Sequence, residues 1–339
     1  MGFDRIIGQS ELKQRMAAEI SSKRGNTYIV SGPAGSGKSL IAEELARGFL
    51  CEHPGSNGAC GKCNCCTYTE NGSNSDLVRI DVKKNESNIP VDRIREEVVG
   101  DYETAPRFSP NKVYLIDADY IGVEAQNALL KSIEEPPANV IFILEVTNAD
   151  TLLPTIQSRA VDYKIKPYST DEVKKIARLC GVEEDDAELD LLAEFADGIP
   201  GRAVKLASDD SFTKLKDDLL DLVLGMSGRP ISDAILMSEE IFGEYKDDQG
   251  EPVILLLWIL GDLMKLATDI DCERVRFVTD RTAMEKFVVA HREVTAREIG
   301  RAVEAVNDFM ADRKVNVSYD AAVTAMILKI HGEFNKCPR

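Results

Sequence analysis

The sequence lacks a long apolar segment. Its longest apolar run, residues 253–260, is far shorter than the roughly 20 residues that a membrane-spanning helix needs. Residues 1–16 carry acidic side chains early and contain no apolar centre, so we expect no secretory signal and a cytoplasmic location. Neither an internal repeat of about 20–50 residues nor a low-complexity linker is evident in the sequence.

Basic residues are in the minority. Lysine and arginine number 41 against 58 aspartates and glutamates, which gives a net charge of −17. A field of that sign repels the phosphates of DNA, so the chain is not expected to bind nucleic acid as a free-standing protein. A local basic face on one domain remains compatible with this charge, but an acidic surface that faces protein partners is the simpler interpretation.

Tryptophan and histidine are also scarce, with one and three residues. Trp258 lies among leucines at helical spacing and is predicted to belong to a helical core. His291 and His331 have no recognisable catalytic partner in the sequence, and we interpret both as structural.

The first half of the chain alternates strand-like and helix-like segments. Such alternation predicts an α/β domain with a parallel sheet flanked by helices. The expected strands are residues 26–32, 75–82, 112–119 and 139–147, with a further extended segment at 161–169, and the expected helices are 39–50, 91–102 and 122–137.

Helical periodicity dominates the rest of the sequence. Ser169 and Glu172 have the spacing of a capping box and predict a helix start. We therefore expect three domains: a nucleotide-binding domain over 1–166 with a metal-binding insert at 51–66, a helical lid over 167–208, and a helical domain over 209–339.

A glycine-rich stretch between the first strand and the first helix fits the phosphate-binding P-loop pattern G-x-x-x-x-G-K-[ST]. Its glycines let backbone N–H groups approach phosphate oxygens, and the following helix directs its positive end at the same anion. The pattern predicts binding of ATP or ADP with Mg²⁺, with the lysine on the phosphates and the serine on the metal. The predicted nucleotide-binding residues of this loop are Gly32, Pro33, Ala34, Gly35, Ser36, Gly37, Lys38 and Ser39.

A second acidic motif follows the expected strand at 112–119. Asp117 ends its apolar run, where a P-loop protein places an acid that holds Mg²⁺. The next residue, Ala118, cannot accept a proton, and Asp119 would face the opposite side if the strand continued through it. A positioned base contributes about 10² to 10⁴ in rate, so slow hydrolysis is expected.

Five of the eight cysteines fall within residues 51–66. Cys51, Cys60, Cys63 and Cys66 have the spacing C-x8-C-x2-C-x2-C, which suits a tetrahedral zinc ion. Four protein ligands would make such a site structural rather than catalytic. Two alternatives stay open: Cys65 in place of Cys66, and His53 in place of Cys51.

Taken together, these motifs resemble those of AAA+ clamp-loader subunits of the bacterial DNA polymerase III family. The matching segments are 6–16, the P-loop, the four-cysteine insert, 112–119, 127–137, 146–160 and 198–207. Subunits of the tau/gamma type usually carry Asp-Glu where this chain has Asp117 and Ala118. The alanine and the short chain resemble the delta-prime type, although some delta-prime subunits lack a working P-loop and this sequence keeps every residue of it.

The resemblance assigns roles that spacing alone does not. It implies that Thr147 is a sensor of the nucleotide and that Arg202, in the lid, reads the γ-phosphate bound in the same chain. Ser158 and Arg159 occupy the position of the family's arginine finger, with Ala160 in place of a cysteine. Arg159 would then act on ATP bound by a neighbouring tau/gamma subunit.

The resemblance further implies a five-subunit ring in which residues 209–339 form the oligomerising collar. Its partners would be the tau/gamma and delta subunits, the sliding clamp, and primed DNA reached through the assembled complex. The sequence leaves open whether the chain itself is an enzyme. The alternatives are a tau/gamma-type ATPase and a nucleotide-free scaffold subunit, and the sequence contains no sign of a polymerase active site.

Overall fold

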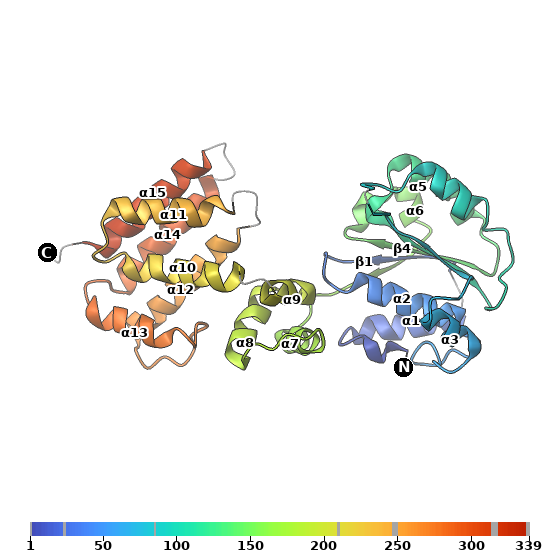
Figure 1. Ribbon diagram of the computed structural model, residues 1–339, viewed down its shortest axis with the longest axis horizontal. Coiled ribbons are helices and arrows are strands. Elements are labelled where there is room, and N and C mark those ends of the chain that lie inside the picture. Colours follow the sequence, from blue (N-terminus) through green and yellow to red (C-terminus); the bar gives the residue numbers. More distant parts are fainter. Residues whose placement is uncertain are drawn as a thin grey trace. The chain divides into compact units, whose positions relative to one another are not determined.

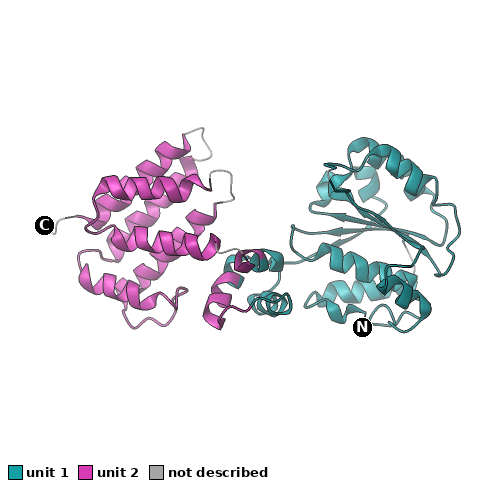
Figure 2. Ribbon diagram, viewed as in Figure 1, with its two compact units in different colours: residues 1–182, 193–204 teal, residues 183–192, 205–339 magenta. Residues whose placement is uncertain are grey.

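The computed structural model describes residues 2–22, 25–84, 86–208, 211–245, 250–312 and 318–336. The chain divides into two compact units, Met1–Val182 with Ala193–Val204, and Glu183–Leu192 with Lys205–Arg339 (Figure 2). The helices of the expected lid are shared between these units, so the three-domain division stays a prediction. Residues 209 and 339, the limits of the expected collar, lie outside the described residues.

The first unit contains a five-stranded parallel sheet with the strand order β2-β3-β4-β1-β5. This arrangement confirms the expected α/β fold. Because all strands are parallel, their carboxyl ends meet at one edge, where ligands bind in open α/β sheets. The strands are β1 (Thr27–Ser31), β2 (Leu77–Ile80), β3 (Lys112–Asp117), β4 (Val140–Val146) and β5 (Val161–Lys164).

Helices cover both faces of the sheet (Figure 1). On one face, α1 (Ser10–Ser22) and α2 (Lys38–Leu50) pack against side chains such as Val30 and Leu115. On the other face, α5 (Val123–Glu134) and α6 (Pro154–Gln157) share a core with Ile29 and Ile116. Neighbouring residues of one strand thus enter opposite cores, as the alternation of a strand requires.

Several predicted elements end earlier than expected, and in two of them the chain takes up a different conformation. β3 stops at Asp117, because its side chain accepts a hydrogen bond from the Asp119 N–H and starts the short 3-10 turn η3 (Ala118–Tyr120). The strand predicted to reach residue 119 is therefore too long, and the condition under which Asp119 would face the opposite side is not met. The predicted helix 91–102 is α-helical only in α4 (Val91–Ile94) and continues as the π-helical turn η2 (Arg95–Val99).

Short elements complete the first part of the chain. Ser169 and Glu172 form the predicted capping box at the start of α7. The elements are η1 (Phe3–Arg5), α3 (Asn64–Glu70), η4 (Ala149–Thr151), α7 (Thr170–Leu179), α8 (Asp186–Phe195) and α9 (Pro200–Ser208).

The second unit is helical, as the sequence predicts. Its core includes Leu222, Phe242, Leu256 and Ile327, all fully buried. Trp258 is only half-buried and lies under the guanidinium of Arg276, so it is not the core residue that its spacing predicts. The helices are α10 (Ser211–Gly225), α11 (Ile231–Gly243), α12 (Glu251–Thr268), α13 (Arg281–Ala290), α14 (Ala296–Asp312) and α15 (Tyr319–Phe334).

None of the helices within the described ranges combines the length and the apolar character that crossing a bilayer requires.

Candidate functional site

The glycine-rich loop lies between β1 and α2, at the carboxyl edge of the sheet. The N–H of Gly32 donates to the carbonyl of Val146, which holds the start of the loop against β4. Gly35 and Gly37 have φ values of 80° and 87°, a left-handed conformation that favours glycine. The loop therefore has the backbone conformation that its sequence predicts, and Lys38 begins the helix whose positive end faces the loop.

The start of α9 lies directly on this loop. The N–H of Gly201 donates to the carbonyl of Gly35 over 2.9 Å. A Cβ atom added to Gly201 would come within 2.6 Å of the Gly35 Cα atom, so this approach needs glycine at both positions. The predicted sensor Arg202 is the next residue, and its guanidinium lies over the ring of Phe195 at 4.8 Å. The structure thus brings Arg202 into the neighbourhood of the P-loop.

Lys38, Thr147 and Asp119 form a closed group of hydrogen bonds. The Nζ of Lys38 donates to the Thr147 hydroxyl over 2.9 Å and to the Asp119 carboxylate over 3.3 Å. The N–H and the hydroxyl of Thr147 both donate to the same carboxylate over 2.6 Å. Burial alone would raise the pKa of Asp119, but the Thr147 hydrogen bonds and the charge of Lys38 outweigh it and lower the pKa.

Asp119 is a residue that the sequence analysis set aside. The 3-10 turn after β3 directs its side chain to two predicted nucleotide-binding residues, Lys38 and Thr147. The signal that could have revealed it is the Asp-x-Asp spacing, because an aspartate two residues after another is typical of a tight turn.

Acidic side chains gather near the predicted magnesium ligands. Glu145 on β4 pairs in register with Asp117 on β3, is 7% exposed, and forms a hydrogen bond with Ser39. Burial raises the pKa of both Asp117 and Glu145, and the charge of Asp81 adds to the effect. A divalent cation prefers such oxygen ligands and would offset their mutual repulsion. Glu145 was not predicted from the sequence, although an acid inside the apolar strand VIFILEV indicates a special role for that side chain.

Arg159 is placed away from this group. Its guanidinium pairs with Glu134 over 3.2 Å and donates to the Thr155 carbonyl over 3.0 Å. The side chain is 42% exposed, and none of its contacts among the described residues involves the P-loop. Arg159 therefore faces solvent rather than the phosphate site of its own chain.

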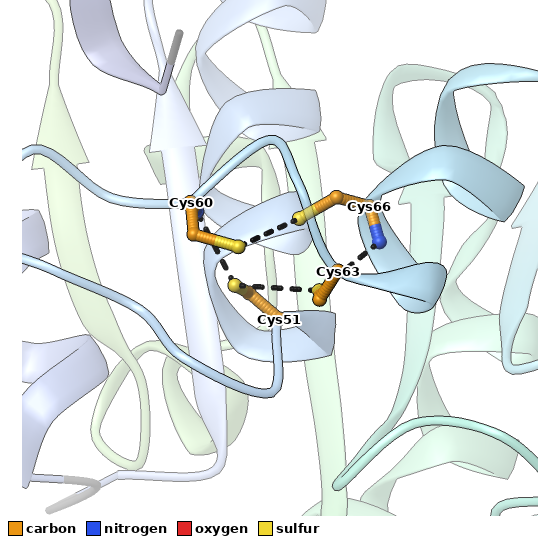
Figure 3. Close-up of side chains that lie close together, drawn as sticks. All are labelled: Cys51, Cys60, Cys63 and Cys66. Carbon is orange, nitrogen blue, oxygen red and sulfur yellow. Dashed lines mark hydrogen bonds between the residues drawn. The ribbon is translucent and has the colours of Figure 1, made fainter.

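The four predicted zinc ligands come together around one point (Figure 3). The Sγ atoms of Cys51, Cys60, Cys63 and Cys66 all lie within 4.8 Å of one another. The Cys51–Cys63 and Cys60–Cys66 sulfur distances are both 3.9 Å. A tetrahedral zinc ion with Zn–S bonds of about 2.3 Å separates its sulfur ligands by about 3.8 Å, so these two distances match those of a zinc site.

Backbone N–H groups support these sulfur atoms. The N–H groups of Cys60, Lys62 and Cys66 donate to the sulfurs of Cys51, Cys60 and Cys63. The Lys62 N–H is the main reason that the pKa of the Cys60 thiol falls to about 6. Donors of this kind stabilise thiolates, the form of cysteine that binds a metal.

The two alternative ligands lie elsewhere. The Cys65 thiol donates to the Glu52 carboxylate and the Phe108 carbonyl, and burial chiefly raises its pKa to about 11. His53 contributes its backbone, which donates to the Cys51 sulfur. Within the described residues, neither side chain joins the group of four sulfurs.

Comparison with known proteins finds similarity to subunits of bacterial DNA polymerase III. Residues 8–169 match the family described as DNA polymerase III, delta subunit. DNA polymerase III subunit delta' of Pseudomonas aeruginosa is 34% identical over 55% of this chain and 56% of its own length. Subunit tau of Bacillus subtilis is 29% identical over 72% of this chain and 47% of its own length.

A solved structure from Thermotoga maritima, of a protein related to the DNA polymerase III gamma subunit, aligns with a TM-score of 0.41. It is 15% identical and the alignment covers 96% of this chain and all of that one. The chain spans about half the length of the curated relatives first compared, which are matched over 47%, 56% and 57% of their lengths.

Over about half of its length, the chain is thus similar to the delta', tau and gamma subunits of bacterial DNA polymerase III.

Proposed function

We propose that this chain is the delta-prime-type subunit of a bacterial clamp loader, which binds nucleotide but hydrolyses it slowly. The observation that carries this proposal is Ala118, directly after Asp117 in a phosphate site whose P-loop is otherwise complete. Without a proton acceptor at that position, water is activated poorly. The subunit would contribute to the loader mainly through its surfaces.

In this proposal the backbone of residues 32–37 and Lys38 hold the phosphates, and Ser39 and Asp117 hold Mg²⁺. Thr147 and Arg202 act as sensors of the bound nucleotide. Three observations support these roles. The glycines of the loop are left-handed, Lys38 donates a hydrogen bond to Thr147, and the Gly201 N–H at the start of α9 donates to the Gly35 carbonyl. Bound Mg²⁺ would supply charge neutralisation at the phosphates.

Arg159 is proposed to act in trans, on ATP held by a neighbouring tau/gamma subunit. Its exposure and its surface ion pair with Glu134 support this role, because such a pair stabilises the fold by little and exchanges readily. An arginine delivered to a transferring phosphoryl group stabilises the charge that develops there. Residues 209–339 would form the collar of the ring, and the assembled loader would place the sliding clamp on primed DNA.

The four-cysteine cluster is proposed to hold one structural zinc ion. Its support is the near-tetrahedral sulfur spacing and the backbone donors around it. All four positions are supplied by the protein, so zinc would fix the segment from Cys51 to Cys66 rather than take part in a reaction.

Two alternatives remain. Asp119, close to Thr147 and Lys38, favours an active tau/gamma-type ATPase, since a nearby carboxylate can act as a general base. The same contact favours a nucleotide-free scaffold, because Lys38 already has an internal partner. Equilibrium binding of a labelled ATP analogue separates the scaffold from both nucleotide-binding proposals.

The trans role is tested in a loader reconstituted with its partner subunits, DNA and clamp. Arg159→Ala should lower the DNA-dependent ATPase of the loader about 10³-fold or more, the scale of an arginine finger, if that subunit's site dominates turnover. Nucleotide affinity of the purified subunit should not change. Arg95→Ala is the matched control, because Arg95 forms a comparable exposed ion pair with Asp92. Equal loss of ATPase and of affinity in Arg159→Ala would refute the trans role.

A further inference from the structure

The Asp119 carboxylate is bound to Lys38 and Thr147, the hydrogen-bond donors that a terminal phosphate would need. Its carboxylate accepts three hydrogen bonds, from the N–H of Thr147, the hydroxyl of Thr147 and the Nζ of Lys38. The N–H bond and the hydroxyl bond are both 2.6 Å long and hold the carboxylate from two directions. The turn η3, in which Asp117 accepts from the Asp119 N–H, fixes its backbone as well.

The donors of Lys38 can be counted. A lysine ammonium has three N–H donors, and two of them are directed at Thr147 and Asp119. The third is left for an oxygen of the β-phosphate. A nucleoside diphosphate can therefore bind while every internal hydrogen bond of this group is kept.

A nucleoside triphosphate makes a different demand. The P-loop lysine reaches both the β- and the γ-phosphate in proteins with this motif. A γ-phosphate must then displace Asp119 from Lys38, or share the lysine with it at close range. Two negative groups around one ammonium repel each other, and the partial exclusion of water from Lys38, which is 13% exposed, strengthens that repulsion.

We infer that this site prefers a nucleoside diphosphate with Mg²⁺ over a triphosphate, and that Asp119 is the specificity-determining residue. The inference rests on the proposed nucleotide binding. The two residues would act together: Ala118 removes the base for hydrolysis, and Asp119 disfavours binding of the triphosphate that is hydrolysed. A subunit that keeps a diphosphate would hold its P-loop and α9 in one arrangement while its neighbours turn over.

The test is isothermal titration calorimetry on the purified full-length chain with Mg²⁺ and either ADP or a non-hydrolysable ATP analogue. ADP should bind at least about tenfold more tightly, which corresponds to about 1.4 kcal/mol. Asp119→Asn keeps the size of the side chain and removes its charge. Asp119→Asn should bind the ATP analogue more tightly, so that its affinities for ADP and for the analogue become similar.

Asp150→Asn is the matched control, because it removes the same charge from an exposed residue near Thr147. In Asp150→Asn, the ratio of the affinity for ADP to the affinity for the ATP analogue should equal that of the unchanged protein. Tighter binding of the analogue by the unchanged protein, or an unaltered ratio in Asp119→Asn, would overturn the inference while nucleotide binding stands. No binding of either nucleotide would overturn both. If Asp119→Asn does not fold, the ratio measured in the unchanged protein still shows whether the site prefers the diphosphate.

Discussion

The cysteine cluster and the proposed phosphate site belong to the same unit. They differ in whether their side chains are already bound to another protein group. In the cluster, four sulfurs face one point and backbone N–H groups support them. In the phosphate site, Lys38 and Thr147 are bound to Asp119, an internal carboxylate. A metal can enter the first site without displacing a protein group, whereas a triphosphate in the second must displace Asp119 from Lys38 or share the lysine with it.

In the proposed roles, this difference separates a site that maintains the fold from one that responds to a ligand. A closed set of four ligands contributes folding free energy whenever the metal is present. An internal ion pair at a binding site reduces the affinity for any ligand that must break it. The same α/β framework thus carries one site of each kind.

The largest expected effect comes from breaking the closed site. Cys66→Ser removes one buried ligand, and we expect zinc content to fall from about one ion per chain to near zero, with a clear drop in melting temperature. Metal analysis after dialysis and thermal melting measure both. The phosphate site should keep nucleotide affinity within about threefold below the melting range, because its contacts do not involve the cluster.

Cys65→Ser is the matched control for that variant. Cys65 is adjacent and equally buried, but its thiol contacts Glu52 and Phe108 instead of the cluster. It should retain zinc. Loss of zinc in Cys65→Ser but not in Cys66→Ser would show that the ligand set is wrong.

A smaller effect is expected where α9 lies on the P-loop. Gly201→Ala adds a methyl group 2.6 Å from the Gly35 Cα atom, so α9 must shift away from the loop. Overpacking of this kind costs roughly 1 to 3 kcal/mol. Nucleotide affinity should fall several-fold in calorimetry, while zinc content stays constant.

Gly122→Ala provides the comparison, because a Cβ at Gly122 meets no atom within 4 Å. It should change nucleotide affinity little. If Gly201→Ala binds nucleotide as well as the unchanged protein, the start of α9 does not shape the phosphate site.

The smallest effect is expected at the capping box of α7. Ser169→Ala removes the hydrogen bond from the Glu172 N–H and should lower the free energy of unfolding by about 1 kcal/mol. Denaturant unfolding measures the change. Both sites should be unaffected, so altered zinc content or nucleotide affinity would mean that the two sites are not independent of this helix start.

Much of the fold and part of the site could be predicted from the sequence. Strand and helix periodicity located the sheet, and the glycines of the P-loop pattern located the turn between β1 and α2, because local patterns report local structure. The four cysteines were predicted as a group because their spacing allows one short segment to supply all the ligands.

The rest depends on where the chain turns. The strand was predicted to reach Asp119, but Asp117 ends it with its own side chain. Glu145 and Ser39 are far apart in the sequence, and only the pairing of β3 with β4 and the position of α2 bring them together. Contacts of that kind follow from tertiary packing, which one sequence does not encode in a local pattern.

The most direct test of the central proposal is steady-state ATP turnover by the purified chain, measured beside ADP binding under the same conditions. The proposed delta-prime-type role predicts stoichiometric binding with turnover at least about 10²-fold below that of a tau/gamma-type subunit, since the positioned base is missing. Lys38→Ala should abolish the binding. Rapid turnover that Lys38→Ala eliminates would contradict the proposal and identify the chain as an active ATPase of the loader.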